Sequence, residues 1–516
     1  MNVPRPRSLK LAVLLCLEVI ALNIIFLPST MNFNFWAFDD QGANLVVQYL
    51  IRAGYRPTVG FGYPYGLLPL LFGRIWFDAF GATPAACLAA MALCAALVAW
   101  ALARIATTAR VGLPGIALFV IALPLAIPLP APNLAHVLEA ALLSNALAEQ
   151  VAARRGRALA LAAAAAFTKP SMAYVYGFVL LLLMLWELRR DGQLKLRPLL
   201  RVLLPAIVTV AVLGAVLAVI YTPSAVFGTL LPIAGMSIYS SNHFGFFGAG
   251  RPFWYFPGVH LAYYVGTVAG FWIGSTVWLL VCGALAARRI RQSSGEGRAA
   301  AEVVLCCAIL QLSFVWLFFG GFFSWFYYLY LLLIGAAIAA TWGPSYRYVA
   351  CILALMAAVG QKAELSGLYH AWRATAPSPE MANLWASPAE RSEWTSVLGI
   401  VQAARAQAAG ATMLDVEGGA ELLFPGFEMP VSLYLVPGLA TQTDISRKLT
   451  QLSDASVVVI PAASLNNPVL SNWPVFRRAL DQYRMIWKGD SFQVYRRTRM
   501  PGAATLPSRR YGPASP

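Results

Sequence analysis

The chain alternates long apolar runs with short polar segments up to about residue 360, and the alternation is lost after that point. A helix that crosses a bilayer needs about 17–25 apolar residues. On this basis the pattern predicts a polytopic α-helical membrane protein with eleven spans, at residues 11–27, 83–103, 111–128, 136–153, 158–168, 171–187, 199–221, 259–286, 300–319, 322–340 and 346–360.

Two segments between the first two spans have a helical pattern of a different kind. Residues 41–53 alternate an apolar face with a polar one, and Gly54 is suited to end that helix. Residues 64–80 are apolar but short, and they carry Arg74 and Asp78 four positions apart. We expect both segments to lie at the outer membrane interface as amphipathic helices.

The last third of the chain has mixed polarity and predicts a small α/β domain over residues 361–500. The same pattern assigns residues 1–360 to a transmembrane domain and the Pro-, Ala- and Ser-rich residues 501–516 to a disordered tail. The expected strands are 412–416, 432–436, 456–460 and 491–495, and the expected helices are 390–408, 443–452 and 473–483.

Composition narrows the class of protein. The chain has 516 residues, of which 59% are hydrophobic and 12% charged, whereas soluble proteins carry about 25% charged residues. The net charge of +16 would suit nucleic-acid binding in a soluble protein. Here most of the basic residues within residues 1–360 fall in short loops on one side of the predicted spans, which is typical of the cytoplasmic side. We therefore expect no nucleic-acid partner, a cytoplasmic N-terminus and, with eleven spans, an external C-terminal domain.

The first predicted outer loop carries the strongest chemical signal, because Asp39 and Asp40 stand together just after the first span. An aspartate that caps the following helix would explain one of them. It explains a pair less well, and ionisable groups beside a bilayer are costly and often functional. The pattern favours a functional carboxylate pair.

Four motifs together resemble the GT-C superfamily of glycosyltransferases, which use polyprenyl-phosphate sugars. The superfamily includes the protein O-mannosyltransferases and the lipid A aminoarabinose transferases. The matching motifs are FDDQG at the acidic pair, GYPYGLLP at Gly62–Pro69, DAFG at Asp78–Gly81 and AFTKPS around Lys169. The chain departs from the family in two ways. Its acidic pair is Asp-Asp instead of Asp-Glu, and it lacks a lysine that several relatives carry before the prolines.

The resemblance implies an enzyme that moves a sugar from a polyprenyl-phosphate donor to an acceptor hydroxyl at the periplasmic face of a bacterial inner membrane. It aligns Asp39 with the family's general base, and Asp40 would orient the acceptor or the base. Attack opposite the leaving phosphate inverts the anomeric carbon. Protein, lipid A, another glycan and a hopanoid-like lipid are all open as acceptors, and membrane lipids are expected partners.

The donor phosphate needs positive charge or hydrogen-bond donors to hold it. Lys169 follows an apolar run of about ten residues, or about 15 Å of helix, which predicts a lysine inside the membrane. It would contact phosphate or extend to the interface. In the loop 222–258, Arg251 and His243 are candidates for the same phosphate, although the loop also fits an interfacial aromatic belt.

Further candidates lie in the first two outer loops. Arg56, Tyr63 and Tyr65 are assigned to the donor phosphate or its lipid, although Arg56 would equally neutralise the acidic pair or touch lipid headgroups. In the second loop Asn133, His136 and Glu139 are candidates for the acceptor side, and the resemblance favours Glu139, because relatives often hold an acidic residue in this region. The residues specify no metal site. The resemblance leaves a divalent cation open, and one carboxylate pair is a sparse ligand set.

Two other functions fit a protein of this class. A transporter or lipid flippase usually has internal repeats, which the sequence lacks. A membrane ligase of lipid-linked glycans would be expected to use a late outer loop rich in Arg and His. The early carboxylate pair favours the glycosyltransferase.

Overall fold

A computed structural model of the chain describes residues 6–126, 133–192, 195–231, 276–313, 328–348, 350–351, 371–406, 410–415, 418–435, 440–461 and 473–498. The chain forms two compact units. The helical unit comprises Met1–Thr30, Tyr65–Gly81 and Ala85–Ala371. The second unit, called the α/β unit below, comprises Met31–Pro64, Ala82–Pro84 and Trp372–Pro516. The boundary expected after residue 360 lies outside the described residues.

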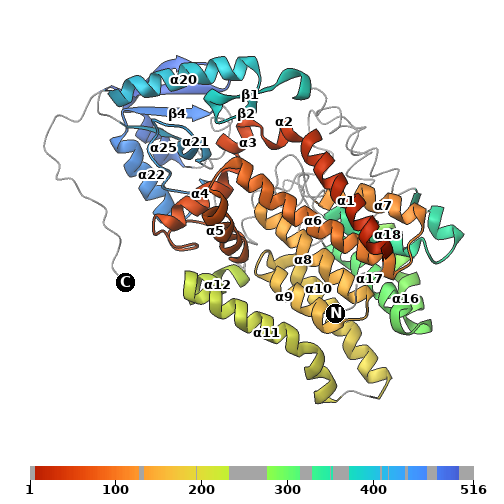
Figure 1. Cartoon of the computed structure of the whole chain (residues 1–516). Helices are drawn as coiled ribbons and strands as arrows, with labels where there is room; N and C mark the ends of the chain where they lie inside the picture. The colour runs from red at the N-terminus through yellow and green to blue at the C-terminus, as the bar shows by residue number, and fades with distance from the viewer. Residues whose placement is uncertain are drawn as a thin grey trace. The chain divides into compact units, whose positions relative to one another are not determined.

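The helical unit contains helices at most of the positions that the hydrophobic pattern predicts (Figure 1). They are α1 (Pro6–Ile25), α2 (Leu27–Thr30), α5 (Leu68–Phe80), α6 (Pro84–Thr108), α7 (Leu113–Ala126), α8 (Leu134–Val151), α9 (Arg155–Ala166), α10 (Pro170–Arg190), α11 (Leu196–Tyr221), α12 (Pro223–Leu230), the π-helix η2 (Trp278–Gly283), α16 (Ala284–Gln292), α17 (Gly295–Ser313) and α18 (Leu329–Ala339).

Among the described residues, three helices are long and apolar enough to cross a membrane, namely α6, α10 and α11. Two shorter apolar stretches lie in α7 and α18, at Leu113–Pro124 and Leu329–Ala339. Helix α11 leaves Leu204, Ile207 and Val219 exposed, which suits a surface in contact with lipid. The structure therefore supports a helical membrane protein, while the number of spans stays a prediction.

The short helix α9 packs against three other helices of the helical unit. These are α8, α10 and α11, while α18 packs against α7 and α17. Alanines dominate α9, and Ala158, Ala162 and Ala165 are buried, so the neighbouring helices approach closely. With twelve residues, α9 is only about 18 Å long. Helix α9 is therefore shorter than a span, and the Lys169 turn follows directly after it.

The α/β unit is built around a four-stranded sheet of order β3-β4-β6-β5. Strand β3 is parallel to β4, and the other pairs are antiparallel. The strands are β3 (Ala411–Met413), β4 (Val457–Pro461), β5 (Tyr483–Lys488) and β6 (Phe492–Arg497), and a separate pair is β1 (Ala376–Ser378) with β2 (Leu384–Ala386). The helices of this unit are α3 (Phe33–Phe38), α4 (Asp40–Arg52), η5 (Pro379–Met381), α20 (Pro388–Ala406), α21 (Gly419–Leu423), α22 (Gln442–Asp454) and α25 (Pro474–Leu480).

Two expected elements of this unit differ from the structure. The helix expected over 473–483 ends at Leu480, and Tyr483 begins strand β5, which pairs antiparallel with β6. The strand expected over 432–436 is absent from residues 432–435, where the chain makes an irregular connection. In both places the local pattern is compatible with either conformation, so pairing with a neighbouring strand decides the outcome.

The first outer loop contributes to the core of the α/β unit. Phe33 of α3 is fully buried, and its ring centroid lies 5.2 Å from that of Trp394 and 5.8 Å from that of Phe424. Phe38 packs against Phe492 of strand β6 at 5.2 Å. The aromatic run after the first helix is therefore a core segment of this unit.

Candidate functional site

The acidic pair lies at the turn between α3 and α4. Asp39 has an extended backbone, and its Oδ1 accepts a hydrogen bond from the backbone N–H of Asp40 at 2.8 Å, so it caps α4. Asp40 occupies the first turn of that helix, and both side chains are half-buried. Burial raises the pKa of Asp39, and the hydrogen bond from Asp40 lowers it by less. A carboxylate with a raised pKa is a better proton acceptor.

Two glycines let helix α21 pack directly against this turn. A Cβ atom on Gly42 would overlap the carbonyl of Trp36 and would lie 3.2 Å from the Cα of Gly419. A Cβ on Gly419 would likewise overlap the Trp36 carbonyl and meet the Ala37 carbonyl oxygen at 3.0 Å. The backbone that presents the two aspartates is thus held by direct packing on the first turn of α21.

The polar face expected for residues 41–53 is not an open interfacial surface. Gln41, Asn44 and Gln48 are buried, and Asn44 donates to the backbone carbonyl of Asp40 at 3.1 Å. Arg52, at the other end of α4, is exposed. The helix is amphipathic as expected, but its polar residues serve packing inside the α/β unit.

A second polar cluster, which we call the lysine cluster, lies in the helical unit and comprises Tyr65, His136, Glu139, Lys169 and Tyr328. The Lys169 Nζ atom lies 3.3 Å from His136 Nδ1 and 5.5 Å from the centroid of the Tyr328 ring. Tyr328 donates a hydrogen bond to Glu139 Oε2 at 2.5 Å, and the Tyr65 hydroxyl lies 3.5 Å from His136 Nε2.

Local backbone structure explains how these residues meet. His136 and Glu139 are one turn apart on α8, so they share a face. Lys169 caps α10 directly after the short helix α9 ends. The N–H groups of Gly66 and Leu68 donate to the carbonyls of Thr168 and Phe167, both at 2.9 Å. This pairing brings Tyr65 beside the Lys169 turn.

Glu139 gives this cluster an open acceptor. Its side chain is 2% exposed, and within the described part of the chain its Oε1 atom makes no hydrogen bond. A buried carboxylate oxygen without a donor is costly, and a ligand hydroxyl would satisfy it. The lysine cluster therefore offers a cation and a free acceptor to one ligand.

The remaining predicted site residues belong neither to the acidic pair nor to the lysine cluster. Asn133 caps α8, because its side chain accepts from the N–H of Ala135 at 2.9 Å. Arg56 is exposed and Tyr63 half-buried, both in the α/β unit. His243 and Arg251 lie outside the described residues. In the described ranges, no group of three or more His, Cys, Asp and Glu side chains is arranged to hold a metal ion.

Tyr328 was not predicted from the sequence. It is the second residue of the apolar aromatic run YYLYLLLI at 327–334, in which a tyrosine resembles one more core residue. The span expected over 322–340 places Tyr328 inside a helix, whereas the structure makes it the N-cap residue of α18. A tyrosine at a helix end can direct its hydroxyl toward a polar partner, and the sequence pattern does not show that position.

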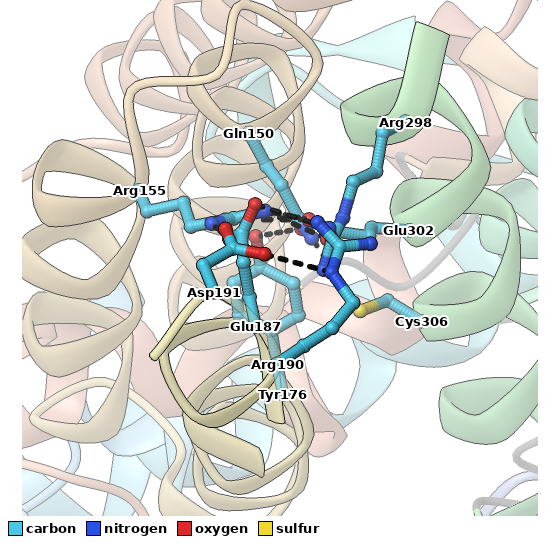
Figure 2. Close-up of polar contacts among 9 residues, drawn as sticks. All are labelled: Gln150, Arg155, Tyr176, Glu187, Arg190, Asp191, Arg298, Glu302 and Cys306. Atoms are coloured by element: carbon cyan, nitrogen blue, oxygen red, sulfur yellow. Dashed lines mark hydrogen bonds and ion pairs between the residues drawn. The ribbon is translucent and has the colours of Figure 1, made fainter. Parts of the chain in front are cut away.

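The helical unit also contains an arginine–glutamate network (Figure 2). Arg155 of α9 pairs with Glu187 of α10 and, at 2.7 Å, with Glu302 of α17. Arg298, which is 2% exposed, lies 3.2 Å from Glu187 and 3.1 Å from Glu302. Several arginines assigned to cytoplasmic loops are therefore paired inside the protein, because each has a glutamate on a neighbouring helix.

Comparison with known proteins gives structural matches only. No protein-family model and no curated protein matches the chain. Among solved structures, it is similar to ArnT from Cupriavidus metallidurans in the apo state, with 14% identity and a TM-score of 0.42. It is also similar to that protein bound to undecaprenyl phosphate, with 13% identity and a TM-score of 0.46. Each match covers 94% of this chain and 97% of the other.

Proposed function

We propose that the chain is an integral membrane glycosyltransferase that moves a sugar from a polyprenyl-phosphate donor to an acceptor hydroxyl. The reaction takes place at the periplasmic face of a bacterial inner membrane, with the N-terminus in the cytoplasm. The observation that carries the proposal is the lysine cluster, in which Lys169 is held among polar groups inside an apolar helical unit.

The lysine cluster suits a lipid-linked phosphate. A lysine ammonium pairs with phosphate oxygens, and the first turn of α10 directs its backbone N–H groups to the same region. The Tyr65 hydroxyl, which lies 3.5 Å from His136 Nε2, adds a further hydrogen-bonding group beside the lysine. Glu139 Oε1 accepts a hydroxyl of the donor or the acceptor. The Lys169 ammonium and the N–H groups of α10 stabilise the negative charge that develops on the leaving phosphate, whereas Glu139 contacts a hydroxyl.

Asp39 is proposed as the general base. The acceptor oxygen attacks the anomeric carbon, its proton passes to the Asp39 carboxylate, and the bond from that carbon to the phosphate oxygen breaks. The electron pair of that bond leaves with the lipid phosphate, and the anomeric configuration inverts. The raised pKa of Asp39 favours the proton transfer.

The test is sugar transfer by the purified chain in lipid nanodiscs, with defined polyprenyl-phosphate sugars and a panel of lipid, glycan and protein acceptors. Lys169→Met is expected to lower transfer about 100-fold, because it removes a charged contact to phosphate. Lys195→Met removes an exposed lysine at the start of α11 and serves as the control. Equal activity of the two variants would contradict the phosphate-binding role of Lys169.

A further inference from the structure

The first outer loop contains a tight turn at residues 55–62. The N–H of Thr58 donates to the Phe61 carbonyl at 2.9 Å, and the N–H of Gly60 donates to the Arg56 carbonyl at 2.7 Å. Thr58 has a φ of +67°, which is costly for a β-branched residue. A turn with such a conformation needs support from the surrounding structure.

That support comes from helix α22 of the same unit. Asp444 is buried, and its Oδ2 accepts a hydrogen bond from the N–H of Gly62 at 3.0 Å. Arg447 donates to the carbonyl of Gly60, and its guanidinium lies 4.2 Å from the centroid of the Tyr55 ring. One turn of α22 thus contacts both ends of the loop turn.

The two contacts exceed what α22 needs for its own stability. Its capping box is complete with Thr441 and Asp444, whose side chains satisfy each other's backbone N–H groups. Arg447 takes no part in that capping box, and it lies 3.4 Å from Asp444 Oδ1 on the same face. Its contacts with Gly60 and Tyr55 therefore serve the loop.

We propose that Asp444 and Arg447 are positioning residues that fix the 55–62 turn and thereby present Arg56 and Tyr63 to the lipid-linked donor. The inference rests on the proposed function. Arg56 lies within the turn, and Tyr63 directly follows Gly62, whose N–H Asp444 holds. Loss of the clamp makes the two side chains less ordered before the donor binds, so donor affinity falls while the chemical step is retained.

The experiment compares Arg447→Ala and Arg447→Lys with the wild-type chain in nanodiscs. Hydrogen exchange is measured on peptides covering residues 54–64, and steady-state kinetics are measured with a polyprenyl-phosphate sugar. Ser446→Ala is the control for an exposed change on α22, and Thr441→Ala is the control for weakening its capping box.

We expect Arg447→Ala to speed exchange in residues 54–64 and to raise the KM for the donor about tenfold with kcat within about twofold. Arg447→Lys is expected to recover part of both effects, because it keeps a donor and a cation beside Tyr55. Unchanged exchange in Arg447→Ala, or a fall in kcat without a change in KM, would overturn the positioning role. A wild-type chain that transfers no sugar from any donor would instead overturn the proposed function, while the exchange data would still report on the turn.

Discussion

The hydroxyl of Tyr328 donates a 2.5 Å hydrogen bond to Glu139, a residue 189 positions earlier in the chain. The bond satisfies one carboxylate oxygen of Glu139 and leaves the other open within the described residues. Because Lys169 lies over the same tyrosine ring, one aromatic side chain orders both an acceptor and a cation.

Tyr328→Phe tests this arrangement. The variant keeps the ring under Lys169 but removes the donor to Glu139, so we expect sugar transfer to fall about tenfold. Tyr330→Phe is a matched control, because Tyr330 is buried nearby in sequence and its hydroxyl makes no hydrogen bond to any described residue. Initial rates at saturating donor give the comparison, and equal losses in the two variants would refute an ordering role for Tyr328.

Asp39→Asn is expected to abolish most transfer, by a factor of about 100–10,000, because amides do not accept the proton. The fold should be retained, since asparagine caps a helix as well as aspartate. The control is Asp78→Asn, which removes an exposed carboxylate from α5. Thermal unfolding and transfer rates measured on both variants separate chemistry from folding, and an active Asp39→Asn enzyme would exclude the base assignment.

The pH dependence follows from the direction of the Asp39 shift. Burial raises its pKa above the ordinary value of 3.8, and the base works only when ionised. Activity should therefore fall with decreasing pH through a midpoint above 3.8. The effect on stability has the opposite sign, because the folded state binds the Asp39 proton more tightly than the unfolded state does. The contribution of Asp39 to folding stability is therefore present below pH 3.8 and is lost as pH rises through the folded pKa. If the Asp39→Glu variant has its activity midpoint at the same pH as the wild type, Asp39 is not the group that sets it.

The arginine–glutamate network predicts a large effect on stability. Glu302→Gln removes one of the two carboxylates that Arg155 and the buried Arg298 contact, so both arginines must share Glu187, which we expect to cost about 3 kcal/mol. Arg190→Gln breaks an exposed pair with Asp191 and is the control, with no change expected in the unfolding temperature. Thermal unfolding in detergent decides the matter, and equal midpoints for the two variants would show that the network is not stabilising.

Gly66→Ala tests the backbone pairing behind the lysine cluster. The added Cβ would overlap the Phe167 carbonyl and lie 2.9 Å from the N atom of Thr168, so the two segments must separate. We expect both transfer and stability to fall. Gly177→Ala in α10 is the control, because nothing lies within 4 Å of its Cβ position and alanine favours a helix. Wild-type activity in Gly66→Ala would show that this backbone pairing is not needed to form the lysine cluster.

The parts of the structure that were predictable depend on local signals. The short apolar run before Lys169 indicated a half-length helix, and α9 has that length. The i, i+3 spacing of His136 and Glu139 placed them on one face. The helix expected over 443–452 is present as α22 (Gln442–Asp454).

The parts that were missed depend on distant partners. Nothing around Asp444 indicates that it accepts from Gly62, because the two residues are 382 positions apart. The sequence around Tyr328 indicates a core residue, and only the contact with Glu139 shows its polar role. The assignment of Met31–Pro64 to the same compact unit as the C-terminal residues follows from aromatic packing across a comparable separation.

The contact between Gly62 and Asp444 also has a consequence for biosynthesis. A ribosome adds about 5–20 residues per second, so the 382 intervening residues take roughly 20–80 seconds to make. Throughout that interval the turn that carries Arg56 lacks its partner helix. A chain truncated before α22 would contain every helix of the helical unit and would still lack the partner of the first-loop turn. Synthesis of the C-terminal segment would therefore be the last step in assembling this turn.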